Sequence, residues 1–348
     1  MTGVSVIAKA VSNPVNVQAD EVVLRVENLV TRFQTGRGVI VPVDHVSFEL
    51  RHGRTLALVG ESGSGKSVTA LSILRLIPEG NGRIDGGRIW FRGRDVLTFS
   101  KRELRSFRGG DAAMVFQEPM SALNPVLTVG AQVAEVFRLH QKASRAEAFQ
   151  RAVAMLAKVR IADPESRARN YPHELSGGMR QRVMIAMALA CNPAVLVADE
   201  PTTALDVTIQ AQMLRLMQGL QRELGTALLF ITHDLGVVAE IADEVAVMYT
   251  GRVVEHAQVN ELFERPLHPY TRGLLAARPG LLGDRKAALQ TIPGMVPVLT
   301  RLPAGCRFAP RCPLAEPICL ERDPELLPVG GLTRKVACHV AQREVEGD

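Results

Sequence analysis

The residues with the clearest chemistry form a glycine-rich octapeptide at positions 60–67, which reads GESGSGKS. It fits the pattern G-x-x-x-x-G-K-[ST], in which small residues let consecutive backbone N–H groups turn inward around phosphate oxygens. Lys66 would reach the β- and γ-phosphates of a nucleotide as a point charge, and the Ser67 hydroxyl would ligate Mg²⁺. The sequence therefore predicts a phosphate-binding loop with nucleotide contacts at Gly60, Ser62, Gly63, Ser64, Gly65, Lys66, Ser67 and Val68.

The sequence on both sides of this loop is suited to position it. The apolar run at 55–59 predicts a buried strand, and residues 67–74 have helical character. The loop would then present the phosphates to the N-terminus of a helix, where backbone N–H groups and the helix dipole favour anions.

A pair of carboxylates follows a second apolar run. Residues 195–198 predict a buried strand that leads directly into Asp199 and Glu200. In doubly wound α/β sheets, ligands bind at the carboxyl ends of such strands. Asp199 is predicted to hold Mg²⁺, directly or through water, and Glu200 is predicted to polarise the attacking water as a general base.

Two single polar residues also follow strand-like runs. Gln117 comes after residues 114–116 and would place its amide on the metal or on the water. His233 comes after residues 228–232 and would bond the γ-phosphate. Each is a common structural residue when it stands alone, so both interpretations depend on the motifs around them.

A short motif about 110 residues after the phosphate loop carries a family resemblance. Residues 175–182, LSGGMRQR, resemble the signature motif of ABC-transporter ATPases, which binds the γ-phosphate of a nucleotide held by the opposite subunit. Residues 179–190 are rich in helix formers, so the serine and the glycine N–H groups before them would face an anion with a positive helix end. The resemblance covers residues 22–280 and implies further nucleotide contacts at Phe33 (adenine stacking), Gln117 (Q-loop), Ser176, Gly177, Gly178, Gln181, Asp206 (D-loop, with Ala204 and Leu205) and His233 (switch histidine).

The resemblance also implies how the chain would work. Two ATPase subunits would enclose each nucleotide between the phosphate loop of one and the signature motif of the other. ATP binding would close this dimer, and hydrolysis would let it open. Because no catalytic residue is substituted, both half sites on this chain are expected to be competent; the catalytic residues are Lys66, Gln117, Glu200 and His233.

The expected fold class is α/β, a P-loop NTPase of the ABC type with a parallel-sheet core, an antiparallel β edge and a helical subdomain. We expect a flexible leader at 1–20, a nucleotide-binding domain at 21–278 and a small extension at 279–348. The helical subdomain is expected at about 129–175, where apolar residues recur at three- and four-residue spacing. In the resembled family this subdomain receives a coupling helix from the membrane subunit.

The extension is rich in proline and glycine and contains four of the five cysteines of the chain. Disulfides seldom persist in the cytosol, so a metal site is the natural hypothesis. The tight C-x₂₋₄-C pairs usual for structural zinc are absent, whereas four cysteines with Pro313 beside one of them suit an iron–sulfur cluster. Zinc and free thiols in a packed tail remain alternatives; the cysteines concerned are Cys306, Cys312, Cys319 and Cys338.

Residues 264–271 and 305–313 make this extension resemble the C-terminal extension of oligopeptide and dipeptide importer ATPases. In that family the four cysteines can hold a [4Fe-4S] cluster. The resemblance implies partners as well: two transmembrane permease subunits, a second homologous ATPase subunit that would form a heterodimer, and an extracytoplasmic peptide-binding protein.

Composition narrows the class of protein without revealing its function. The net charge of +5 is spread over scattered clusters and only 4% of residues are aromatic, which argues against a nucleic-acid partner. No apolar run reaches the roughly 18 residues of a membrane span, and residues 1–20 lack the pattern of a secretory signal. We therefore expect a chain at the cytoplasmic face of the inner membrane, attached through its permease partners.

The sequence thus predicts the ATPase subunit of an ABC importer for oligopeptides or dipeptides, with ATP, Mg²⁺ and a [4Fe-4S] cluster as cofactors. One alternative keeps the machinery and changes the cargo to nickel or another small solute. A second alternative is a non-transport ABC ATPase that remodels ribosomes or DNA. Such proteins usually carry two cassettes in one chain, whereas this chain has one cassette and an importer-type tail.

Overall fold

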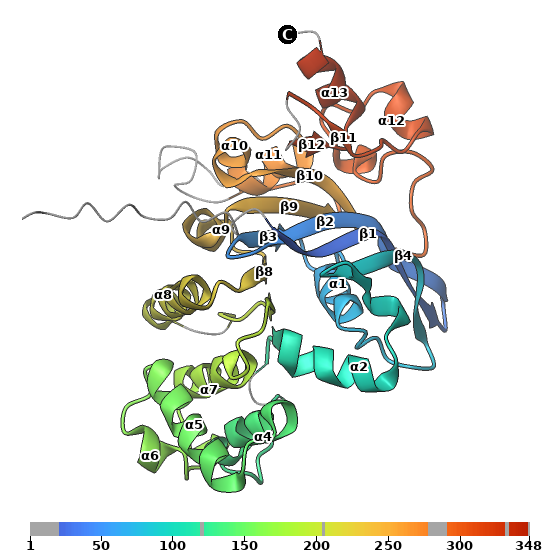
Figure 1. Ribbon diagram of the computed structural model, residues 1–348. Helices are drawn as coiled ribbons and strands as arrows, with labels where there is room; N and C mark the ends of the chain where they lie inside the picture. Colours follow the sequence, from blue (N-terminus) through green and yellow to red (C-terminus); the bar gives the residue numbers. More distant parts are fainter. Residues whose placement is uncertain (1–20, 119–121, 204–205, 278–290, 331–333, 347–348) are drawn as a thin grey trace, which may run out of the picture.

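The computed structural model describes residues 21–118, 122–203, 206–277, 291–330 and 334–346. The predicted leader at 1–20 lies outside the described residues. Figure 1 shows two β-sheets, a helical region at one end and the C-terminal extension at the other. The strands are β1 (Val22–Thr35), β2 (Gly38–Arg51), β3 (Thr55–Val59), β4 (Gly82–Phe91), β5 (Arg94–Asp95), β6 (Ala112–Val115), β7 (Val195–Asp199), β8 (Ala227–Thr232), β9 (Glu244–Tyr249), β10 (Arg252–Gln258), β11 (Leu327–Pro328) and β12 (Lys335–Val336).

Single helices alternate with most strands of the core, and four successive helices between residues 129 and 189 form the helical region. This alternation is what the sequence predicts for a parallel sheet. The helices are α1 (Lys66–Ile73), α2 (Lys101–Ser106), α4 (Val129–Gln141), α5 (Arg145–Lys158), α6 (Pro164–Arg167), α7 (Gly177–Leu189), α8 (Val207–Leu224), α9 (Leu235–Ile241), α10 (Val259–Glu264), α11 (Pro269–Ala276), α12 (Pro317–Glu321) and α13 (His339–Glu346).

The larger sheet has the strand order β11-β12-β10-β9-β3-β8-β7-β6. Its centre is parallel, because β3 pairs with both β8 and β9, and β7 pairs with β8 and β6. Strands β3, β7 and β8 are buried along their whole length, as expected for parallel strands covered on both faces. Their carboxyl ends meet at one edge, and the phosphate loop, the acidic pair and the predicted histidine all follow these ends.

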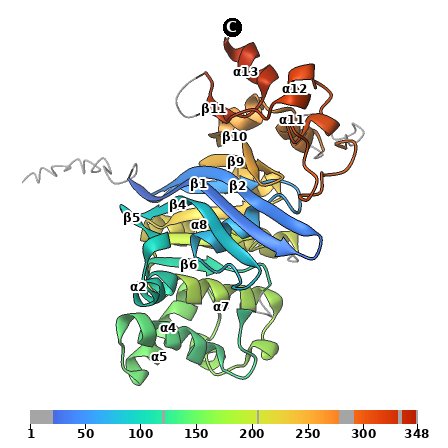
Figure 2. The same cartoon turned by 90° about the vertical axis from the view of Figure 1, so that its right-hand side faces the viewer.

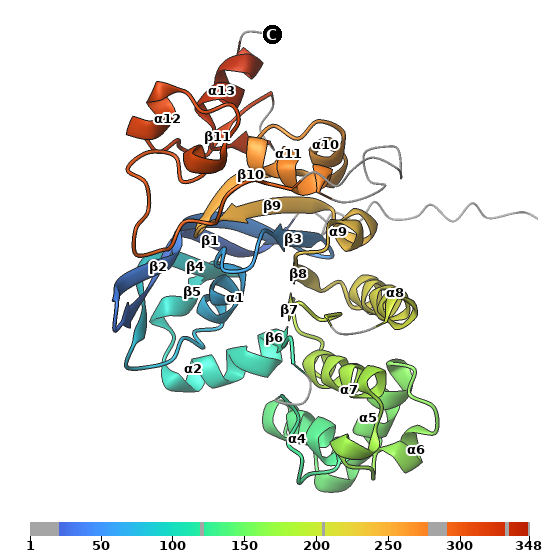
Figure 3. The same cartoon turned by 180° about the vertical axis from the view of Figure 1, so that it is seen from behind.

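The smaller sheet is antiparallel, with the order β2-β1-β4-β5. It lies beside the large sheet and covers α1, as the two opposite views in Figures 1 and 3 show. The parallel core, the antiparallel edge and the helical region confirm the predicted fold class.

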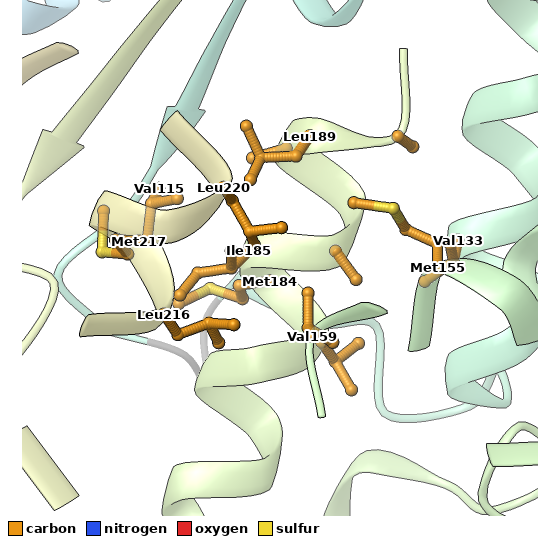
Figure 4. Close-up of a cluster of buried hydrophobic side chains, with 14 of the residues drawn as sticks. Val115, Val133, Met155, Val159, Met184, Ile185, Leu189, Leu216, Met217 and Leu220 are labelled. Carbon is orange, nitrogen blue, oxygen red and sulfur yellow. The ribbon is translucent and has the colours of Figure 1, made fainter. Parts of the chain in front are cut away.

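Helices α4 to α7 form the helical region at the end of the molecule away from the C-terminus (Figures 1 and 3). Thr128 caps α4 and Ser144 caps α5, since each hydroxyl accepts a bond from a backbone N–H of the first turn. Apolar side chains from these helices pack with side chains of α8 and β6 in one core (Figure 4). The labelled members of this core are Val115, Val133, Met155, Val159, Met184, Ile185, Leu189, Leu216, Met217 and Leu220.

The C-terminal extension adds strands to the large sheet. Strand β12 pairs antiparallel with β10 at Glu255 and His256, and β11 pairs with β12. Glu255 is fully buried and its carboxylate accepts bonds from the backbone of Leu267 and His268 and from Arg334 of the extension. The extension therefore docks on the cassette as an ordered element (Figure 2). No helix among the described residues is both long enough and apolar enough to span a membrane.

Candidate active site

The phosphate loop joins β3 to α1 and depends on glycine at two positions. Gly65 caps α1 at a φ of 106°, and a Cβ there would lie 1.9 Å from the carbonyl oxygen of Pro42. Gly60 has a φ of 150°, and a Cβ there would lie 2.2 Å from the carbonyl oxygen of Met248. Both the backbone conformation and the lack of space exclude a side chain at these two positions, so only glycine allows this path of the loop.

Lys66 lies under this loop and is 6% exposed. Its ammonium donates to the carbonyl oxygens of Gly60 at 2.8 Å and Glu61 at 3.0 Å, and to Ser64 Oγ at 3.3 Å. Burial lowers the pKa of Lys66, while the nearby carboxylates, Glu200 foremost, act in the opposite direction. The result is a cation held beneath the site where phosphate charge would lie.

Two oxygen ligands of the kind that Mg²⁺ prefers lie side by side. The Ser67 hydroxyl donates to Asp199 Oδ1 at 3.1 Å, and Asp199 is 6% exposed. Burial raises the pKa of Asp199, and the charge of Glu200 adds to this, while the Ser67 hydrogen bond and Lys66 oppose it. A hydroxyl and a carboxylate beside a phosphate cradle are a donor set that fits Mg²⁺.

Three side chains converge on the Glu200 carboxylate. Its Oε2 accepts from Gln117 Nε2 at 3.1 Å and from Thr203 Oγ1 at 2.9 Å, and its Oε1 lies 3.1 Å from His233 Nδ1. The backbone of Glu200 has a φ of 45°, an uncommon conformation for a residue with a side chain, and its N–H donates to the carbonyl oxygen of Ile231. The carboxylate is thus aimed by three side chains from three loops.

These residues surround one open cavity of about 680 Å³, a size typical of small-ligand sites. The phosphate loop forms one side, and Gln117, Glu200 and His233 form another. The structure therefore brings together residues that the sequence analysis selected from four separate segments. Three lining residues were not predicted: Thr203, Pro42 and Leu299, the last of which comes from the C-terminal extension.

The predicted signature residues lie away from this cavity. Ser176 and Gly177 are exposed, and the Ser176 hydroxyl caps α7 by accepting from Met179 N at 3.4 Å. Gln181 is buried and donates to the carbonyl oxygen of Pro201 at 2.6 Å, so its side chain faces the interior. None of these residues lines the cavity described above, and the roles of Ser176, Gly177, Gly178 and Gln181 stay predictions.

Two other predicted contacts also stay untested. Phe33 is half-buried in β1 with its ring close to Gly82, and it does not line the cavity. Asp206 caps α8 by accepting from Ile209 N at 2.9 Å. The rest of the predicted D-loop, residues 204–205, lies outside the described residues.

The four cysteines of the extension lie around one small cavity together with Phe308. Their surroundings are apolar, and burial raises the pKa of Cys306 to about 11. In the part of the chain that the structure describes, no three His, Cys, Asp or Glu side chains are arranged to hold a metal ion. The donor set suits an iron–sulfur cluster, but the predicted cluster stays a prediction; the cysteines are Cys306, Cys312, Cys319 and Cys338.

Two family models match this chain. The model described as "ABC transporter" matches residues 43–203. The model described as "Oligopeptide/dipeptide transporter, C-terminal region" matches residues 254–319. The first match contains the phosphate loop and the acidic pair, and the second contains the first three cysteines of the extension.

Individual proteins are similar over most of the chain. A probable peptide ABC transporter ATP-binding protein, y4tR of Sinorhizobium fredii, is 55% identical over 90% of this chain and 93% of its own length. The oligopeptide transport ATP-binding protein AppD of Bacillus subtilis is 51% identical over 92% of this chain and 97% of its own length. A solved ATP-binding cassette, described as a dimeric post-hydrolysis state bound to ADP and Pi, is 27% identical with a TM-score of 0.61, over 68% of this chain and 98% of that chain.

Proposed function

The chain belongs to the ABC transporter ATP-binding subunits of the oligopeptide/dipeptide importer family, and on this premise we propose that it hydrolyses MgATP at a subunit interface to power the import of peptides. The observation that carries the proposal is the convergence of Gln117, Thr203 and His233 on the Glu200 carboxylate beside the phosphate loop. The chain is an ATPase, in agreement with the ADP- and Pi-bound cassette that it resembles.

We infer a division of roles from this geometry. The loop N–H groups and Lys66 would hold the phosphate oxygens, and the adjacent Ser67 and Asp199 side chains would hold Mg²⁺, which would supply positive charge to the phosphates. Glu200 accepts a proton from the attacking water as the water oxygen bonds to the γ-phosphorus and the bond to ADP breaks. His233 and Gln117 orient the Glu200 carboxylate and contact the same reaction centre.

The exposed signature motif supports a sandwich dimer. Ser176 and Gly177 face solvent at the N-terminus of α7, a 13-residue helix whose positive end would meet a γ-phosphate. That phosphate would belong to a nucleotide on a second, homologous ATPase subunit, and the similar solved cassette is described as dimeric. We propose a heterodimer with such a subunit.

Membership of an importer family supports permease partners. We propose that two permease subunits dock on the helical region and the Gln117 segment, and that an extracytoplasmic binding protein delivers the peptide. The chain would then lie at the cytoplasmic face of the membrane, attached through the permeases.

The cargo is tested by ATP hydrolysis in the complex reconstituted in vesicles with its binding protein. Peptide-loaded binding protein is expected to raise the rate several-fold above that of empty binding protein, because the permeases favour the closed ATPase dimer only when cargo is delivered. Nickel-loaded binding protein is the matched control and is expected to give the basal rate. Stimulation by nickel or another solute alone would contradict a peptide cargo and leave the catalytic roles intact.

We propose further that Cys306, Cys312, Cys319 and Cys338 ligate a [4Fe-4S] cluster, supported by four thiols around one cavity. Chain purified without oxygen is expected to contain about four iron and four acid-labile sulfide atoms. Cys306→Ser should lose both, whereas the control Cys191→Ser, a substitution outside the extension, should keep them. Zinc without sulfide, or no metal at all, would contradict the cluster.

A further inference from the structure

The C-terminal extension reaches the phosphate loop through a buried arginine. The guanidinium of Arg311 makes two contacts with the Glu61 carboxylate, Nη1 to Oε2 at 2.8 Å and Nη2 to Oε1 at 3.2 Å. The Arg311 side chain is 4% exposed. Glu61 is the second residue of the phosphate loop, so this fork-to-fork ion pair joins the extension directly to the nucleotide site.

The same arginine organises the segment that precedes it. Its Nε donates to the carbonyl oxygen of Pro293 at 3.0 Å, and Nη2 lies 3.4 Å from the carbonyl oxygen of Ile292. This segment also carries Leu299, whose side chain lines the nucleotide cavity. Arg311 therefore bonds both the phosphate loop and the segment that leads to Leu299.

Glu61 is held at its backbone as well. Its N–H donates to the Tyr270 hydroxyl at 2.8 Å, and its carbonyl oxygen accepts from Lys66 Nζ at 3.0 Å. Tyr270 packs against Tyr249, whose hydroxyl lies 3.4 Å from Arg311 Nη1. The side chain, N–H and C=O of this one loop residue each have a partner, and the partners of the side chain and of the N–H come from the region after residue 260.

A glycine-rich loop has many conformations available, and ordering it on binding costs free energy of about 1–2 kcal/mol per residue. A contact that orders the loop before the ligand arrives removes part of that cost from binding. Arg311 ends the short 3-10 helix η5 (Ala309–Arg311), and Cys312 follows it at the edge of the thiol cavity. The backbone of Arg311 therefore belongs to a regular element of the extension.

We propose that Arg311 is a positioning residue of the ATP site, which pre-orders the phosphate loop through Glu61 and so makes the C-terminal extension a determinant of ATP affinity. Arg311 does not contact the reacting atoms. Its effect should therefore fall on ATP binding and leave the rate at saturating ATP nearly unchanged.

The test measures ATP binding by the full-length chain, and KM and kcat for hydrolysis, in four variants. Arg311→Met and Glu61→Gln are each expected to weaken ATP binding and raise KM about tenfold, the effect of one loop residue regaining its freedom, with kcat within about twofold. The double variant should lose no more ATP affinity than Arg311→Met alone, because both substitutions remove the same ion pair and Arg311→Met also removes the bonds to Pro293 and Ile292. Arg311→Lys, which keeps the charge and loses the fork, should fall between wild type and Arg311→Met.

The matched control is Arg343→Met, which breaks an exposed ion pair with Glu316 in the same extension and should leave ATP binding unchanged. Docking of the extension is monitored by the reactivity of its four cysteines toward a thiol reagent, which should remain at the wild-type level in Glu61→Gln. Unchanged ATP affinity in Glu61→Gln, or additive losses in the double variant, would overturn the proposal. The proposal would also be overturned if ATP affinity fell only in those variants whose extension cysteines had become reactive toward the thiol reagent.

Discussion

Glu200→Gln is expected to bind MgATP as tightly as the wild-type chain and to hydrolyse it about 10²- to 10⁴-fold more slowly, the usual contribution of a general base. The amide keeps the size of the carboxylate and can still bond Thr203 and His233, but it cannot accept a proton from water. In the proposed dimer hydrolysis is the step that allows opening, so this variant should also accumulate in the closed, ATP-bound state.

Single-turnover hydrolysis and gel filtration with ATP measure the two consequences of Glu200→Gln separately. The matched control is Glu223→Gln, which removes a carboxylate that pairs with Lys158 on the surface and should leave the rate unchanged. Normal turnover by Glu200→Gln would show that another group takes the proton.

Lys66→Ala is expected to lose ATP binding, the step that precedes hydrolysis. It removes the buried cation that is proposed to bind the phosphates, and truncating one partner of a buried charge pair costs about 2–5 kcal/mol, or at least about 30-fold in ATP affinity. The substitution also releases the carbonyl oxygens of Gly60 and Glu61 from their donor, so the loop itself should loosen.

Equilibrium binding of a fluorescent ATP analogue distinguishes Lys66→Ala from Glu200→Gln, since only the first should lose the nucleotide. Lys101→Ala, at an exposed position of α2, removes an equal charge and serves as the control. Wild-type affinity in Lys66→Ala would mean that the backbone cradle alone holds the phosphates.

The convergence of the proposed catalytic side chains was predictable because each of them follows a strand of the parallel sheet. Gln117, Glu200 and His233 each come just after an apolar run, and parallel strands bring their carboxyl ends to one edge of a sheet. The local sequence therefore predicted that these three side chains lie close together in space. Thr203 lies three residues after Glu200 in the same loop, so its hydroxyl could have been predicted to reach the Glu200 carboxylate.

The contribution of the extension was not predictable in the same way. Arg311 and Glu61 are separated by 250 residues, and no periodicity or spacing links them. Leu299 in a proline-rich stretch gave no sign that it would line the nucleotide cavity, because its segment is held by long-range contacts such as the bond from Arg311 to the Pro293 carbonyl oxygen. The interior position of the Gln181 side chain was not predictable either, because the order of residues in a motif does not show which of them face outward, and its role at the nucleotide stays a prediction.

Because Glu61 and Arg311 are 250 residues apart, the ribosome synthesises the two partners of this ion pair at different times. At roughly 5–20 residues per second, a ribosome delivers Arg311 about 12–50 seconds after Glu61. During that interval the cassette strands can already fold, but the phosphate loop lacks the arginine that orders it. Full ATP affinity is therefore acquired last, after the extension has been synthesised and docked, and an unfinished chain would compete poorly for nucleotide with complete subunits.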